Sequence, residues 1–131
     1  MAGLLDGLHI LLVEDEYLIA MDVEAICLDH GAADVTLVSR PSDLDQPIGN
    51  IDTAILDLML DGESTLDFAA RLQTSGIPFI FASGHSMNEE MQARFPGARL
   101  VAKPYSGEDL VNALVAAGRR TPPQSTGDVI T

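Results

Sequence analysis

The stretch from His9 to Leu18, "HILLVEDEYL", joins an apolar run to three consecutive carboxylates, and the fold can be worked out from it. Every residue of its "ILLV" segment is apolar, which is typical of a strand buried on both faces of a parallel sheet. The carboxylates that follow, Glu14, Asp15 and Glu16, repel one another and resist losing water. They therefore form either a solvated turn or a site where a positive charge sits between them.

Apolar segments of strand length recur along the chain, with helical patterns between them. The segment "FIFA", which ends one residue before Ser83, again contains no polar residue. The predicted strands are His9–Val13, Val35–Val38, Thr53–Leu56, Ile77–Ala82 and Ala98–Ala102.

The intervening segments are predicted to be helices. Ile19, Val23 and Ile26 fall on one face of the segment after the three carboxylates, and Gly76 is placed to end a later helix. The segment from 41 to 50 is the weakest helix because Pro47 and Gly49 interrupt it. Three helices begin with a serine followed three residues later by an acidic residue, the capping-box spacing: Ser64 with Asp67, Ser86 with Glu89, and Ser106 with Asp109.

This alternation predicts an α/β fold in which a βα unit is repeated five times. Because crossovers between parallel strands are right-handed, such a chain forms a doubly wound sheet with helices on both faces, in one of the two common strand orders. Residues 1–118 are expected to form this single domain. Residues 119–131, "RRTPPQSTGDVIT", are polar and contain two adjacent prolines, so we expect a flexible C-terminal tail and no output domain.

Composition excludes several classes of function. The chain of 131 residues has 20 acidic and 7 basic residues and a formal net charge of -13, which disfavours binding to nucleic acid or to an anionic membrane. Cys27 is the single cysteine, so neither an internal disulfide nor a multi-cysteine metal site is possible. We see no signal peptide and no apolar run of membrane-spanning length, and we expect a cytoplasmic protein.

Polar residues follow the predicted strands where an open α/β sheet binds its ligands, beyond the carboxyl ends of the strands. Oxygen ligands without histidine or cysteine suit Mg²⁺, and a lysine can pair with a carboxylate or hold an anion. A carboxylate, a magnesium ion, an ammonium and a hydroxyl around one point form a site for phosphoryl transfer, with the carboxylate as nucleophile. The residues are Glu14 and Asp15 after the first strand, Asp57 after the third, Ser83 after the fourth and Lys103 after the fifth.

Each of these residues also has an ordinary structural interpretation. The acidic cluster can be a solvated turn, and Asp57 a helix cap. Lys103 can extend its charge to solvent over an apolar surface, and Ser83 can be a turn residue beside Gly84. Only their joint position on four strand ends indicates a site.

On these residues the chain resembles the receiver domain of two-component response regulators, over roughly residues 7 to 118. The motifs are "VEDE", "LDLML", "FASG" and "AKPY". The resemblance implies the flavodoxin-like strand order 2-1-3-4-5, and a signalling domain that catalyses its own phosphorylation and dephosphorylation rather than an enzyme acting on other substrates. By position, Asp57 is the phosphoacceptor, and Ser83 and Lys103 hold the phosphoryl oxygens. Mg²⁺ is bound by Asp15, Asp57 and the backbone carbonyl of Met59, with Glu14 as a direct or water-mediated ligand. The Lys103–Pro104 bond is expected to be cis.

The chain further resembles a subgroup of mostly stand-alone receivers with a Phe-Ala-Thr-Gly motif after strand four, in which Ser83 here replaces the threonine. Two other positions depart from the general family. Leu100 stands where most receivers have the aromatic residue that reports phosphorylation, and Tyr105 is an aromatic residue nearby. Glu14 stands where aspartate is commoner. We interpret His85 as a loop residue and Cys27 as a core residue.

The leading hypothesis is a single-domain response regulator. It would receive its phosphoryl group from a sensor histidine kinase or a histidine phosphotransfer protein. It would then signal by contact with a downstream protein or act as a phosphate sink. The alternative, favoured by Leu100, is a binding module that works without phosphorylation. A flavodoxin-like cofactor binder or an aspartate-nucleophile phosphatase is a weaker possibility, since their motifs after strand one are missing.

Overall fold

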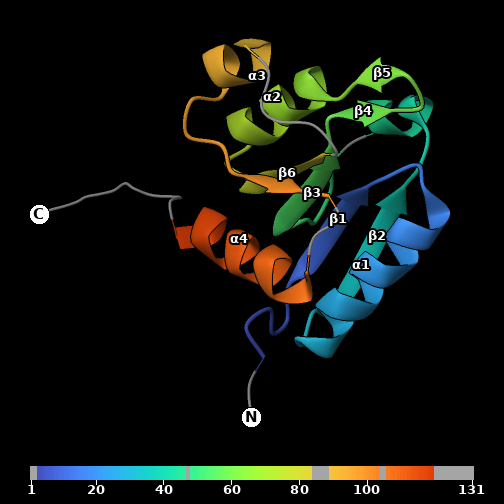
Figure 1. Cartoon of the computed structure of the whole chain (residues 1–131), viewed down its shortest axis with the longest axis vertical. Helices are drawn as coiled ribbons and strands as arrows, with labels where there is room; N and C mark the ends of the chain where they lie inside the picture. Colours follow the sequence, from blue (N-terminus) through green and yellow to red (C-terminus); the bar gives the residue numbers. More distant parts are fainter. Residues whose placement is uncertain (1–2, 47, 84–88, 104–105, 120–131) are drawn as a thin grey trace, which may run out of the picture.

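A five-stranded parallel sheet forms the centre of the computed structural model, which describes residues 3–46, 48–83, 89–103 and 106–119. Its order is β2-β1-β3-β6-β7, which is 2-1-3-4-5 when only these strands are counted, as predicted (Figure 1). The strands begin or end within two residues of the predicted limits. They are β1 (His9–Val13), β2 (Asp34–Val38), β3 (Thr53–Asp57), β6 (Phe79–Ser83) and β7 (Leu100–Ala102).

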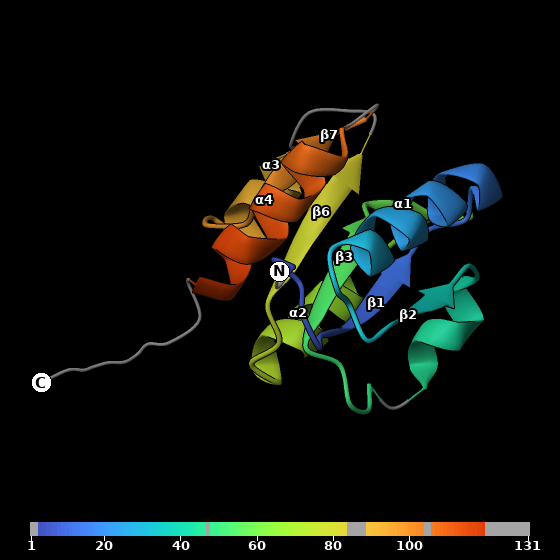
Figure 2. The same ribbon diagram turned by 90° about the horizontal axis from the view of Figure 1, so that it is seen from below.

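Helices cover both faces of the sheet, and each face has its own apolar core (Figures 1 and 2). The helices α1 (Tyr17–Asp29) and α4 (Gly107–Arg119) pack on one face, and α2 (Leu66–Thr74) and α3 (Glu89–Arg94) on the other. Alternate residues of β1 enter opposite cores, because successive side chains of a strand point to opposite faces. Ile10 and Leu12 face the α1–α4 core, whereas Leu11 and Val13 face the α2–α3 core. The uninterrupted "ILLV" run is thereby explained.

The predicted helix ends are confirmed in part. Ser106 Oγ accepts a hydrogen bond of 3.0 Å from the Asp109 N–H, and Gly76 follows α2 with a φ of 76° while the Ile77 N–H returns to the Leu72 carbonyl. Ser64 is not the N-cap residue that was predicted, although its Oγ accepts a hydrogen bond of 3.2 Å from the Leu66 N–H at the start of α2. Thr65 occupies the N-cap position of α2, because Ser64 belongs to a strand of a small hairpin. Ser86 lies outside the described residues.

Two short elements differ from the predicted pattern. The segment between β2 and β3 forms only a 3₁₀ helix, η1 (Pro41–Asp45), so the predicted α-helix there was wrong. The hairpin was not predicted and pairs β4 (Met59–Leu60) with β5 (Glu63–Ser64). Its two turn residues, Asp61 and Gly62, both have positive φ, as a type I′ turn requires.

Within the described part of the chain, no helix has the length and apolar content needed to span a bilayer. Apart from Arg119, the predicted tail lies outside the described residues.

Cys27 is fully buried in the α1–α4 core, as predicted. Burial raises the pKa of its thiol from 9.0 to about 11, so the thiol stays protonated in the folded protein at pH 8. We expect a thiol reagent such as 5,5′-dithiobis(2-nitrobenzoate) to leave the native protein unlabelled at pH 8 and to label it fully in urea. Because the folded pKa lies above the unfolded one, this thiol lowers the free energy of unfolding as the pH rises above about 9. In Cys27→Ala, this fall in the free energy of unfolding above about pH 9 should be absent. Rapid labelling of the native protein at pH 8 would contradict the assignment of Cys27 as a buried, protonated thiol.

Candidate functional site

Four of the predicted site positions meet at the carboxyl edge of the sheet. Glu14 follows β1, Asp57 ends β3, Ser83 ends β6 and Lys103 follows β7. The strand registers bring these ends side by side, with Asp57 opposite Ala82 and Ser83 opposite Ala102. The parallel sheet therefore assembles the edge that the sequence predicted, from residues up to 89 positions apart.

The Lys103 ammonium lies between two carboxylates at this edge. Lys103 Nζ donates to Glu14 Oε2 at 2.8 Å and to Asp57 Oδ2 at 3.0 Å. Only 13% of the Lys103 and Asp57 side chains and 2% of the Glu14 side chain are exposed. The bridge therefore connects the ends of β1, β3 and β7 in a setting where water screens the charges weakly.

Burial and pairing act in opposite directions on these charges. Burial raises the pKa of the Glu14 carboxyl, and the hydrogen bonds from Lys103 and from the Glu16 N–H only partly oppose the rise. Burial alone would lower the pKa of the Lys103 ammonium, but the hydrogen bonds to Glu14 and Asp57 outweigh it, so the pKa is raised. Lys103 is thus held firmly as a cation, while Glu14 shares that cation with Asp57.

The acidic cluster after β1 is the only group of three or more acidic or metal-ligating side chains that comes together among the described residues. One carboxylate oxygen of each of the three residues, Glu14, Asp15 and Glu16, lies within 4.8 Å of the other two. Asp15 is exposed, and its Oδ2 accepts a hydrogen bond of 2.8 Å from the Asp61 N–H in the hairpin turn. Glu14 Oε1 accepts a bond of 3.0 Å from the Glu16 N–H. The turn of the β4–β5 hairpin therefore fixes Asp15 beside the edge.

The remaining predicted positions are placed as follows. Met59 lies in β4, two residues after Asp57, with its side chain exposed. Ser83 is buried, and its carbonyl accepts a hydrogen bond of 2.8 Å from the Lys103 N–H. Leu100 is half-buried and begins β7. His85, Pro104 and Tyr105, and with them the expected cis bond, lie outside the described residues.

Thr65 is a residue of the site that sequence reasoning missed. It is fully buried, and its hydroxyl donates to the carbonyls of Asp57 and Leu58, at 2.5 and 3.2 Å. The Thr65 N–H also donates to the Leu58 carbonyl, at 3.0 Å. These bonds fasten the loop after β3, which carries Asp57, to the start of α2. The one signal in the sequence was the Asp61–Gly62 pair, which marks a tight turn that returns the chain toward Asp57.

Comparison with known proteins agrees with this fold. No protein-family model matches the chain. An uncharacterized transcriptional regulatory protein of Bacillus subtilis (strain 168), YbdJ, is 30% identical over 108 residues, which cover 80% of this chain and 48% of that protein. The chain thus spans about half the length of the curated relative that it matches.

Solved structures with the same fold include response regulators and their receiver domains. A receiver protein from Sinorhizobium medicae is 25% identical with a TM-score of 0.74, over 90% of this chain and 99% of that one. The non-phosphorylated HemR receiver domain from Leptospira biflexa is 21% identical with a TM-score of 0.73, over 89% and 98%. The response regulator PhyR from Brucella abortus is 26% identical with a TM-score of 0.68, over 86% of this chain and 47% of that one.

The fold and the edge define a doubly wound α/β domain of the flavodoxin-like class, with buried charges at the carboxyl ends of its strands. Its structural neighbours are response regulator receivers, and the chain shares their fold.

Removing the Lys103 ammonium leaves Glu14 buried without its countercharge. In the absence of divalent metal, Lys103→Met should lower the free energy of unfolding by about 3 kcal/mol, measured by urea denaturation. The double variant Glu14→Gln with Lys103→Met should lose less than the sum of the two single variants, because the neutral amide needs no cation. Strict additivity would show that the pair does not interact in solution.

Removing the Thr65 hydroxyl leaves the buried Asp57 carbonyl without its donor. Thr65→Val, which keeps the side-chain shape, should lower the free energy of unfolding by about 1–3 kcal/mol, and Thr65→Ser should retain most of it. Urea denaturation of the three proteins measures both effects. A valine variant as stable as the parent would contradict the role assigned to the hydroxyl.

Proposed function

We propose that this chain is a single-domain response regulator that accepts a phosphoryl group on Asp57 from a phosphohistidine. The observation that carries the proposal is the Lys103 ammonium 3.0 Å from Asp57 Oδ2, held there by buried Glu14. A structural domain gains little from such an arrangement, since burying charges is costly and apolar residues can replace a buried ion pair without loss of stability. A phosphoacceptor, by contrast, needs a carboxylate beside a fixed cation.

In the proposed transfer, an Asp57 carboxylate oxygen attacks the phosphorus of the donor. The new O–P bond forms as the P–N bond breaks, and the electron pair of that bond leaves with the imidazole nitrogen, which takes up a proton. The Lys103 ammonium is placed to neutralise a phosphoryl oxygen, and Ser83 lies on the neighbouring strand end as a hydroxyl donor. The chain then acts as a signalling domain rather than as an enzyme with a separate substrate.

The residues at this edge suit Mg²⁺. Glu14, Asp15 and Asp57 carry three negative charges against one on Lys103, which leaves two for a divalent cation, and their donor atoms are oxygens. We assign the metal to Asp15, Asp57 and the Met59 carbonyl. Because both Glu14 oxygens already accept hydrogen bonds, we expect Glu14 to contribute through water. When bound, the metal would neutralise oxygens of the transferring group.

The first helix offers a surface for the phosphodonor protein. The helix α1 begins directly after Glu16, beside the edge, and carries exposed apolar side chains along its length: Tyr17, Leu18, Met21 and Leu28. Helices with apolar residues all round are normally buried, so an exposed α1 of this kind fits a partner surface. We infer that a histidine kinase or a histidine phosphotransfer protein docks there.

The signal would leave by contact with a downstream protein, or the chain would drain phosphoryl groups from a shared kinase. A second candidate function is a binding module that works without phosphorylation. It is favoured by Leu100, which lacks the aromatic ring found in most receivers. The two candidates differ in whether a phosphodonor and Mg²⁺ modify the protein at all.

Intact-protein mass spectrometry decides between them. After incubation with Mg²⁺ and acetyl phosphate, the parent protein should gain one phosphoryl group. The same incubation should leave Asp57→Asn unmodified, and so should a sample containing EDTA instead of Mg²⁺. Asp52→Asn provides a matched control on an exposed carboxylate, and it should react like the parent.

Failure of the parent to react, both with acetyl phosphate and with phosphorylated histidine kinases, would overturn the phosphoacceptor proposal and favour the binding module. An adduct that persists in Asp57→Asn would place the modification on a different residue.

A further inference from the structure

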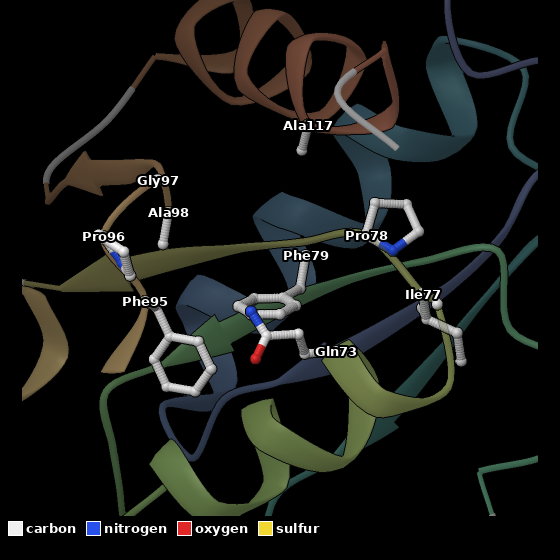
Figure 3. A pocket seen from close by; sticks show the side chains of 10 residues that line it. Gln73, Ile77, Pro78, Phe79, Phe95, Pro96, Gly97, Ala98 and Ala117 are labelled. Atoms are coloured by element: carbon white, nitrogen blue, oxygen red, sulfur yellow. The ribbon is translucent and has the colours of Figure 1, made fainter. Parts of the chain in front are cut away.

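An apolar hollow of about 350 Å³ lies at the opposite end of the sheet from Asp57 and Lys103. It opens where β6 begins, at Phe79, whereas Ser83 at the site ends the same strand. Figure 3 shows the rings of Phe79 and Phe95 in the hollow, and Ala117 pointing toward them from α4. The hollow therefore lies between the ends of α2 and α4 and the segment that joins α3 to β7.

The lining of the hollow suits aliphatic side chains. The rings of Phe79 and Phe95 meet edge to face with centroids 5.6 Å apart, and Ile77, Pro78 and Ala98 extend the apolar wall. Gln73 contributes the only polar side chain among the described residues that line it. A charged or strongly polar ligand would lose its hydration here without gaining partners.

The residue that follows this wall in the chain is a cation. Arg99 follows Ala98 and is exposed, and within the described part of the chain it forms no ion pair or side-chain hydrogen bond. This is unusual in a chain with 20 acidic and only 7 basic residues. An occupant with a carboxylate beside its apolar side chains would therefore complement both the hollow and Arg99.

The chain itself contains such a segment. Ala117 lines the hollow, α4 ends at Arg119, and residues 120–131 follow outside the described part. Val129 and Ile130 are the only large aliphatic residues of that segment, and Asp128 precedes them. The nine residues 120–128 reach up to about 30 Å when extended, so the segment can return to the hollow.

We propose that Val129 and Ile130 occupy the hollow, with Asp128 facing Arg99. Tethering at Arg119, the end of α4, gives the segment a local concentration that is roughly millimolar for a short linker, so a contact too weak for a separate peptide at low concentration suffices here. The docked segment bridges α2, the start of β6, the α3–β7 connection and α4. It leaves the acidic edge open, so the contact is separate from the proposed phosphorylation.

NMR of the full chain, with ¹³C-methyl alanine and assigned resonances, tests this proposal. The double variant V129D/I130D should shift the methyl resonances of Ala98 and Ala117. The double variant Q124D/S125D adds the same two charges to the same segment and should leave both resonances unchanged. Arg99→Glu should weaken the contact, so that the Ala98 and Ala117 resonances move toward their positions in V129D/I130D.

Addition of a synthetic peptide with the sequence of residues 125–131 to V129D/I130D should return both resonances toward the parent positions. Identical resonances in the parent and in V129D/I130D would overturn the proposal. A difference between them that grows with protein concentration would also overturn it, because the hollow would then be filled by the segment of a second copy.

Discussion

The hydrogen bonds of Lys103 to Glu14 and Asp57 depend on the whole sheet being in its correct order. Lys103 is 89 positions from Glu14 and 46 positions from Asp57 in the chain, and all three residues lie at the ends of different strands. Glu14 is buried because it continues a strand covered on both faces, so its carboxylate needs a partner supplied by the fold. Lys103 meets that need only when β7 lies at the far edge of the sheet. The charges at this edge therefore also favour one topology over its alternatives.

Much of the sheet and of its edge could be predicted because two simple physical rules apply. A strand buried on both faces must be apolar at every position, which "ILLV" and "FIFA" satisfy, and parallel strands bring their carboxyl ends to one edge. The 3₁₀ helix at Pro41–Asp45 and the β4–β5 hairpin follow no such rule, because elements of two to five residues depend on their tertiary surroundings. Thr65 shows the same limit. Its hydroxyl matters only because the hairpin returns it to the Asp57 carbonyl, a contact invisible in the periodicity of the sequence.

The two ends of the sheet differ in their chemistry. The carboxyl edge collects charges because backbone turns and the α1 start expose polar groups there, and Lys103 offsets only part of the negative charge. Toward the amino end of β6, the rings of Phe79, Phe81 and Phe95 contact one another, and the hollow beside Phe79 and Phe95 is mostly apolar. An ionic ligand is therefore favoured at one end and an apolar segment at the other. The two ends can serve different partners without competing for one surface.

The absence of an aromatic residue at Leu100 limits how the proposed phosphorylation could reach a partner. A ring that changes its side-chain conformation can report a distant event by itself, but a half-buried leucine at the start of a three-residue strand presents little area to do so. The backbone offers another route, since the Lys103 N–H donates to the Ser83 carbonyl and joins the ends of β6 and β7 directly. Any movement of Ser83 toward a phosphoryl group would pull on that bond, and with it on the short β7. Because β7 is the last strand of the sheet, only β6 restrains it by strand pairing. A displacement of that edge strand, rather than the rotation of one ring, is then the change that a partner would detect.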